Sequence, residues 1–84
     1  MPNFKVVSIT TQDITKETKG FLLDGRADYM ACGACEGGLF FTKDTISSLY
    51  SELVEEEDKS SVFEDIANLL TRLHDERADM LFLN

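Results

Sequence analysis

The chain has 84 residues, of which 16 are Asp or Glu and 8 are Lys or Arg, so its formal net charge is -8. This length suits a single domain, residues 1–84. The acidity argues against direct contact with nucleic acid, and the hydrophobic content of 43% argues against intrinsic disorder. No apolar run approaches the ~18 residues of a membrane span. We therefore expect a cytoplasmic protein that makes no contact with a membrane.

The first half of the chain is predicted to form a small antiparallel sheet. All five glycines lie between residues 20 and 38, and glycine is typical of turns but costly within helices. The pair Asp24-Gly25 is the strongest of these signals, because it favours a two-residue hairpin turn. We expect a meander of three to four short strands within residues 3–43. Their apolar centres are predicted at residues 4–11, 21–23, 28–32 and 39–41.

The second half is predicted to form an antiparallel helical hairpin. Residues 44–57 carry apolar side chains at helical spacing, and so do residues 61–79. The break at residues 58–60 is so short that the two helices must pack antiparallel. Ser61 followed by Glu64 has the spacing of a capping box, which predicts the start of the second helix. The expected fold class is α+β, with the hairpin packed on one face of the sheet.

The last apolar run, residues 80–83, has three interpretations. It could continue the second helix, return as a final strand, or dock on a partner. We favour burial within the domain or its dimer, because four exposed apolar side chains in a row would form an adhesive patch.

The acidity belongs to the second half, where residues 43–84 carry a net charge of -7 against -1 for residues 1–42. The acids of residues 55–58 lie at a predicted helix C-terminus, where they oppose the helix dipole and repel one another. Charge that costs stability is a candidate for binding, although an acidic turn can also serve only as solvated surface. The predicted partner-binding residues are Glu52, Glu55, Glu56, Glu57, Asp58, Asp65 and Glu76.

Cys32 and Cys35 form a C-x-x-C pair with three interpretations. The thiols could simply pack, since cysteine is often buried. They could supply two of four zinc ligands, with a second copy completing the site across a two-fold axis of a homodimer. They could also form a reducible disulfide, but the neighbouring Glu36 disfavours the reactive thiolate. We expect no cofactor, with zinc as the alternative.

Together these features favour a non-enzymatic protein-binding module, because the sequence contains no recognisable catalytic constellation. We expect a small inhibitor or adaptor, of the kind that phages and other mobile elements encode, which covers a basic surface of a partner protein. That surface could itself bind nucleic acid, because carboxylates can take the place of phosphates. The alternatives are a zinc-bridged structural module that uses Cys32 and Cys35, and a thiol redox protein.

Overall fold

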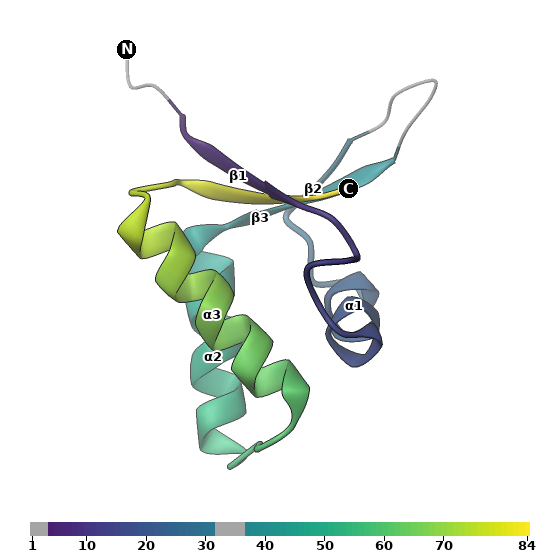
Figure 1. Cartoon of the computed structure of the whole chain (residues 1–84), viewed down its shortest axis with the longest axis vertical. Helices are drawn as coiled ribbons and strands as arrows, with labels where there is room; N and C mark the ends of the chain where they lie inside the picture. The colour runs from purple at the N-terminus through teal and green to yellow at the C-terminus, as the bar shows by residue number, and fades with distance from the viewer. Residues whose placement is uncertain (1–3, 32–36) are drawn as a thin grey trace.

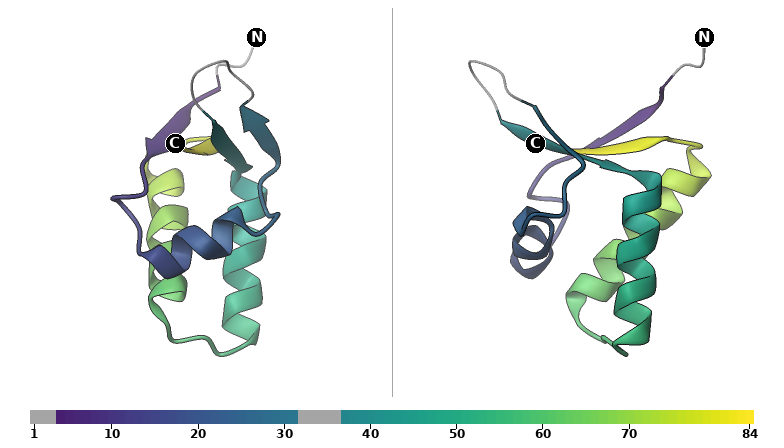
Figure 2. Two further views of the ribbon diagram at one scale, coloured as in Figure 1. Left: turned by 90° about the vertical axis from the view of Figure 1, so that its right-hand side faces the viewer. Right: turned by 180° about the vertical axis from the view of Figure 1, so that it is seen from behind.

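The computed structural model describes residues 4–31 and 37–84, which form a four-stranded sheet with three helices on one face (Figure 1). Figure 2 shows the same layering from two further sides. The elements in chain order are β1 (Val6–Ile9), α1 (Lys16–Leu23), β2 (Tyr29–Ala31), β3 (Gly38–Thr42), α2 (Lys43–Glu55), α3 (Ser61–Asp75) and β4 (Met80–Leu83). The α+β class, with a helical hairpin packed on one face of a sheet, is confirmed.

The sheet is mixed, and the expected antiparallel meander within residues 3–43 is wrong in this respect. The strand order is β1-β4-β3-β2. β3 pairs antiparallel with β2 and β4, while β1 pairs parallel with β4. The reason is the C-terminal run Met80–Leu83, which returns as a strand between β1 and β3 and so occupies a central position. Of its three interpretations, the final strand is confirmed.

Residues 21–23 lie in a helix, contrary to the strand prediction. α1 begins after Thr15, whose Oγ1 accepts a hydrogen bond from the Thr18 backbone N–H at 3.2 Å. Leu22 is fully buried while Leu23 is half exposed, as in a helix with one face on the core. Gly25 follows the helix with φ of 74°, the left-handed conformation common after helix C-termini. Asp24-Gly25 thus closes a helix instead of joining two strands.

The hairpin helices match the periodicity of the sequence, with small differences at their ends. α3 ends at Asp75 instead of residue 79, because the chain must turn before entering β4. Its N-cap is Ser60, one residue before the predicted Ser61, and the Ser60 Oγ accepts a hydrogen bond from the Val62 N–H at 3.2 Å. No helix within residues 4–31 and 37–84 has the length and apolar content of a membrane span.

Each hairpin helix is followed, two residues after its end, by a residue other than glycine in the left-handed conformation: Glu57 with φ of 55° and Arg77 with φ of 53°. After α2, the Glu57 N–H donates to the Val54 carbonyl and the Asp58 N–H to the Leu53 carbonyl, both at 3.0 Å. This is the Schellman pattern, in which glycine is usual because a side chain costs on the order of 1 kcal/mol. The chain keeps charged side chains at two positions where glycine would be more stable.

A continuous apolar core lies between the sheet and the helices. Every helix and three of the strands contribute side chains that are almost fully buried. This core orients the hairpin so that its turn lies at the end of the molecule farthest from the sheet (Figure 1). The largest fully buried apolar side chains are Ile9, Leu22, Phe41, Ile46, Ile66, Leu73 and Leu81.

Candidate functional site

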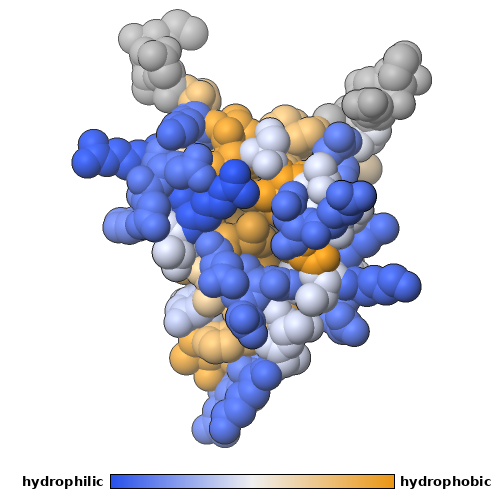
Figure 3. Space-filling view, in the orientation of Figure 1, coloured by the Kyte–Doolittle hydropathy of each residue, from blue (hydrophilic) through white to orange (hydrophobic). Residues whose placement is uncertain are grey.

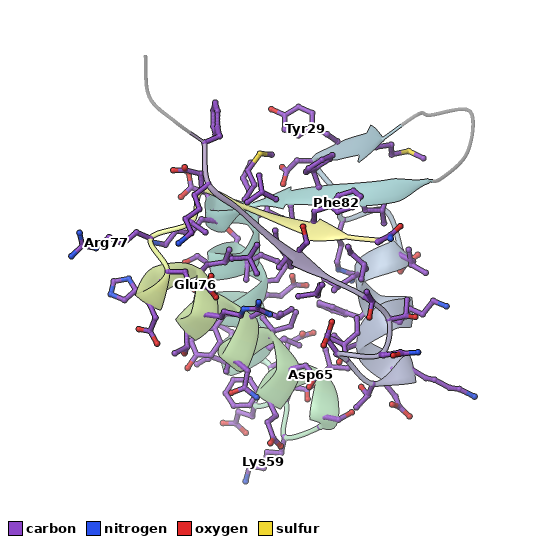
Figure 4. The ribbon with its side chains drawn as sticks, turned by 45° about the horizontal axis from the view of Figure 1, so that its top comes forward. Tyr29, Lys59, Asp65, Glu76, Arg77 and Phe82 are labelled. Carbon is purple, nitrogen blue, oxygen red and sulfur yellow. The ribbon has the colours of Figure 1, made fainter. Side chains whose placement is uncertain are left out.

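Five acidic residues gather around the turn between α2 and α3, and we call this group the acidic tip. The four glutamates of this group are exposed, and its one aspartate, Asp58, is half-buried. Figure 4 shows Lys59, which belongs to the same turn, at the end of the hairpin away from the sheet. The acidic tip consists of Glu52, Glu55, Glu56, Glu57 and Asp58.

The charge of the acidic tip is not neutralised by ion pairs. Across the part of the chain that the structure describes, two ion pairs form, and both lie elsewhere. Arg26 approaches Asp24 at 3.4 Å, and the Arg72 Nε lies 2.8 Å from the Glu76 Oε2. The negative end of the α2 dipole points into the same turn. The tip is therefore a concentrated source of negative potential.

Asp58 combines charge with a structural role at the start of α3. Its Oδ1 accepts hydrogen bonds from the Ser60 Oγ and from the Ser60 N–H, the latter at 2.7 Å. These hydrogen bonds, the hydroxyl first, hold the pKa of Asp58 below its ordinary value of 3.8. Asp58 thus stays ionised and also orients the residue that caps α3.

An apolar hollow of about 430 Å³ lies within the acidic tip. Val54 from α2 is 47% exposed there, and Phe63 from α3 forms the other apolar wall. The Phe63 ring is held by stacking on Tyr50, with centroids 5.5 Å apart. Glu57, Asp58 and Lys59 line the same hollow, so apolar surface lies beside two carboxylates and one ammonium group. In the space-filling view, Figure 3, an apolar area is also visible towards this end of the hairpin.

Asp65, although predicted as part of the binding surface, turns its carboxylate towards α1. Its Oδ2 accepts hydrogen bonds from the Thr15 N–H at 3.0 Å, the Thr15 Oγ1 at 3.1 Å and the Thr18 Oγ1 at 2.6 Å. Burial alone would raise the pKa of Asp65, but the bonds from Thr15 and Thr18 outweigh it and lower the pKa below 3.8. Asp65 joins α3 to the start of α1.

Glu76 lies away from the acidic tip. It is the C-cap residue of α3 and pairs with Arg72 one turn earlier. Figure 4 shows Glu76 and Arg77 at the end of α3 that adjoins the sheet, opposite to Lys59. The structure thus brings together five of the seven predicted partner-binding residues and places Asp65 and Glu76 elsewhere.

A second surface, which the sequence did not single out, is the face of the sheet opposite the helices. We call it the open face. Strand pairing sets Phe40 opposite both Phe82 and Tyr29, and alternate residues of a strand share a face. Among the described residues, its strand side chains are Val6, Ser8, Tyr29, Phe40, Met80 and Phe82. None is charged, nor is Thr42, which follows Phe40 on this side and caps α2.

The open face has projecting aromatic rings at its edges and a hollow between them. Phe4, just before β1, is 74% exposed, and Tyr29 on β2 is 60% exposed. β1 and β2 are the outer strands, so the two rings stand at opposite edges. Phe40 and Met80 line the hollow between them, which measures about 460 Å³, and the Asp79 side of its wall is charged. Figure 4 shows Tyr29 projecting from the sheet on the side away from the helices.

A signal for the open face is present in the sequence. The β3 residues Leu39, Phe40 and Phe41 and the β4 residues 80–83 are unbroken apolar runs. A strand that is apolar on both faces is typical of a sheet covered on both sides, whereas a half-solvated strand alternates with polar residues. The helices cover only one side, which leaves apolar residues on the other.

Cys32 and Cys35 lie outside the described residues, so the packing, metal and redox interpretations of this pair stay predictions. Within residues 4–31 and 37–84, no group of three or more His, Cys, Asp or Glu side chains is placed to share a metal ion.

Comparison with models of known protein families, with curated proteins and with solved structures found no match. The acidic tip and the open face are therefore the features of the chain that bear on its function.

Proposed function

We propose that this chain is a non-enzymatic protein-binding module that docks its acidic tip on a basic surface of a partner protein. The observation that carries the proposal is the combination of exposed carboxylates without ion pairs and an apolar hollow among them. A turn that served only to keep the surface solvated would need no apolar hollow. Val54, at 47% exposed, is poorly placed for a side chain whose only role is packing.

The hollow suits a lysine or arginine side chain of the partner. Such side chains have an aliphatic stem that covers apolar surface and a charged head that stays near water or a carboxylate. The stem would lie on Val54 and Phe63 while the head meets Glu57 and Asp58, which line the same hollow. An arginine could also stack on the Phe63 ring. These contacts favour a basic partner over an acidic or neutral one, and they must outweigh the repulsion from Lys59, which lines the same hollow.

The remaining charge would guide the partner into contact. Complementary potentials raise association rates, and salt screens them with a Debye length of about 8 Å at physiological ionic strength. The module would then act by covering a basic surface, as a small inhibitor or adaptor. A surface that binds nucleic acid is one such target, because it is built to receive closely spaced negative charge.

The test is capture of partners by the immobilised chain from a cytosolic extract at low salt, with two charge-matched variants. The first carries Glu55→Gln, Glu56→Gln and Glu57→Gln in the acidic tip. The second carries Glu17→Gln, Asp44→Asn and Asp75→Asn, three exposed carboxylates outside the tip.

Both variants raise the net charge of -8 by the same three units. The proposal predicts that basic proteins captured by the wild type are lost from the tip variant and retained by the control. Equal retention by the two variants would show that net charge, or another surface, is responsible for capture.

A further inference from the structure

We propose that the open face binds the open face of a second copy of this chain, so that the protein forms a two-fold symmetric dimer with its helices on the outside. This inference does not depend on the acidic tip. It rests on the charge distribution of the sheet, on the shape of the open face and on its size.

The strands carry no charged side chain on the described part of the open face. Charged residues make up 29% of the chain, yet no strand residue described on the open face is charged. A sheet face that stays in water normally alternates with polar and charged side chains. The one charged residue among the described residues that line the hollow is Asp79, whose Oδ2 accepts a hydrogen bond from the Lys5 N–H at 3.0 Å. Aromatic side chains with few charged neighbours are typical of the core of an interface.

The open face is complementary to itself. A two-fold interface needs the same surface to supply both the projecting part and the space that receives it. The rings of Phe4 and Tyr29 project at the edges, and the hollow of about 460 Å³ lies between them over Phe40 and Met80. Two copies related by a two-fold axis can each place an edge ring in the hollow of the other.

The open face is large enough for a weak, specific dimer. Four strands spaced by about 4.8 Å, with up to five residues at about 3.4 Å each, give a face of roughly 19 by 17 Å. With two mostly exposed rings and four half-buried side chains, we expect roughly 500 to 600 Å² of buried surface per copy. The total of roughly 1,100 Å² is at the lower limit for a specific interface. The dimer should therefore be reversible, with a dissociation constant on the order of micromolar.

Net charge does not oppose this arrangement, although two chains of -8 repel each other elsewhere. The hairpin helices are about 20 Å long, and two sheets packed face to face lie about 10 Å apart. The two acidic tips would point in opposite directions, on the order of 50 Å apart, which is several Debye lengths. Contact through any face near the helices would bring the acids much closer together.

The test is sedimentation equilibrium of the full chain in reducing buffer, from about 5 to 200 µM, which brackets the expected dissociation constant. The wild type should shift from monomer to dimer in this range, and the dimer should persist or tighten as salt rises. Tyr29→Lys on the open face should weaken dimerisation at least tenfold, and so should Phe4→Lys. Leu23→Lys replaces a residue that is 51% exposed on α1 and should leave dimerisation unchanged.

Thermal unfolding monitored by circular dichroism identifies any variant that fails to fold. If one of the two open-face variants, Tyr29→Lys or Phe4→Lys, does not fold, the other one provides the test. A wild type that stays monomeric over the whole range would overturn the proposal. So would equal weakening by Leu23→Lys and Tyr29→Lys, which would place the interface elsewhere. Loss of the dimer on addition of a chelator would also overturn it, in favour of a metal-bridged dimer. Capture of basic partners through the acidic tip is a separate measurement and can succeed or fail independently.

Discussion

Phe40 and Phe82 lie opposite each other on the two central strands, with ring centroids 4.6 Å apart, on the face of the sheet that no helix covers. The Phe82 ring also occupies the space above Gly38, where an added Cβ would overlap two ring atoms. The absence of a side chain at Gly38 thus allows the aromatic ring to lie against the strand. Neighbouring side chains of the open face thus contact one another, which gives this face a defined shape for binding.

Gly38→Ala should destabilise the protein by about 1 to 2 kcal/mol, because the new methyl group must displace the Phe82 ring. Gly20→Ala is the matched control: nothing lies within 4 Å of the added atom, and residue 20 is inside α1. That change should stabilise the protein by about 0.5 to 1 kcal/mol. Urea unfolding measures both, and a stabilising Gly38→Ala would refute the described packing of Phe82.

Glu57→Gly should stabilise the fold by on the order of 1 kcal/mol, since Glu57 has φ of 55° after α2 and glycine adopts this conformation without strain. Arg77→Gly changes the equivalent position after α3, where φ is 53°. It should stabilise less, because it removes a positive charge from a helix C-terminus. Only Glu57→Gly should reduce capture of basic partners. Loss of capture in both variants would indicate that altered stability is the cause.

Acidification should destabilise the protein, and Asp65 should account for part of the loss. Its pKa is lower in the folded chain than the ordinary value of 3.8. Its stabilising contribution is therefore complete above the unfolded pKa and is lost as the pH falls through the folded one. Asp28 shifts in the same direction, because hydrogen bonds from Thr42 and Thr45 outweigh the opposing effect of burial.

Asp65→Asn should lower the stability at pH 7 by about 1 to 2 kcal/mol, because bonds that Thr15 and Thr18 donate to a charged acceptor are lost or weakened. It should also flatten the loss of stability on acidification. Asp75→Asn, at an exposed position on α3, is the control and should change neither quantity much. Urea unfolding at several pH values makes the comparison. An unchanged pH dependence in Asp65→Asn would mean that Asp65 does not link α3 to α1.

Leu81→Ala should destabilise the protein by about 2 to 5 kcal/mol, because it removes a fully buried side chain from a central strand. Leu23→Ala removes the same atoms from a side chain that is 51% exposed and should cost less than about 1 kcal/mol. Thermal or urea unfolding distinguishes them. Similar small losses in both would contradict the central position of β4.

The sequence was sufficient for the helical hairpin, because apolar spacing along α2 and α3 is a local signal. It was not sufficient for the partner of β1. β4 lies more than seventy residues further along the chain, and no local pattern encodes such a pairing. α1 was missed because eight residues are too few for periodicity to outweigh the strong turn signal of Asp24-Gly25.

The candidate site was predictable in charge and only partly in geometry. The run of residues 55–58 carries negative charge whatever the fold. Its exposure could be predicted because the run falls at the turn of the predicted helical hairpin. Asp65 is equally acidic, but its bonding partners Thr15 and Thr18 lie 50 and 47 residues earlier. Only the folded chain reveals that its carboxylate holds α1. The apolar runs of β3 and β4 signal an apolar face, but the sequence does not show which side chains form the open face, because they come from strands far apart in sequence.

The claim that charge at the acidic tip guides a basic partner is tested most directly by the association rate of a captured partner, measured by surface plasmon resonance as salt rises. From about 0.05 to 0.5 M NaCl, the rate for the wild type should fall at least tenfold, with a much smaller change in the dissociation rate. The variant with Glu55→Gln, Glu56→Gln and Glu57→Gln should associate more slowly at low salt and depend less on salt. An association rate that is independent of salt, or that is the same in the wild type and the variant, would contradict the account.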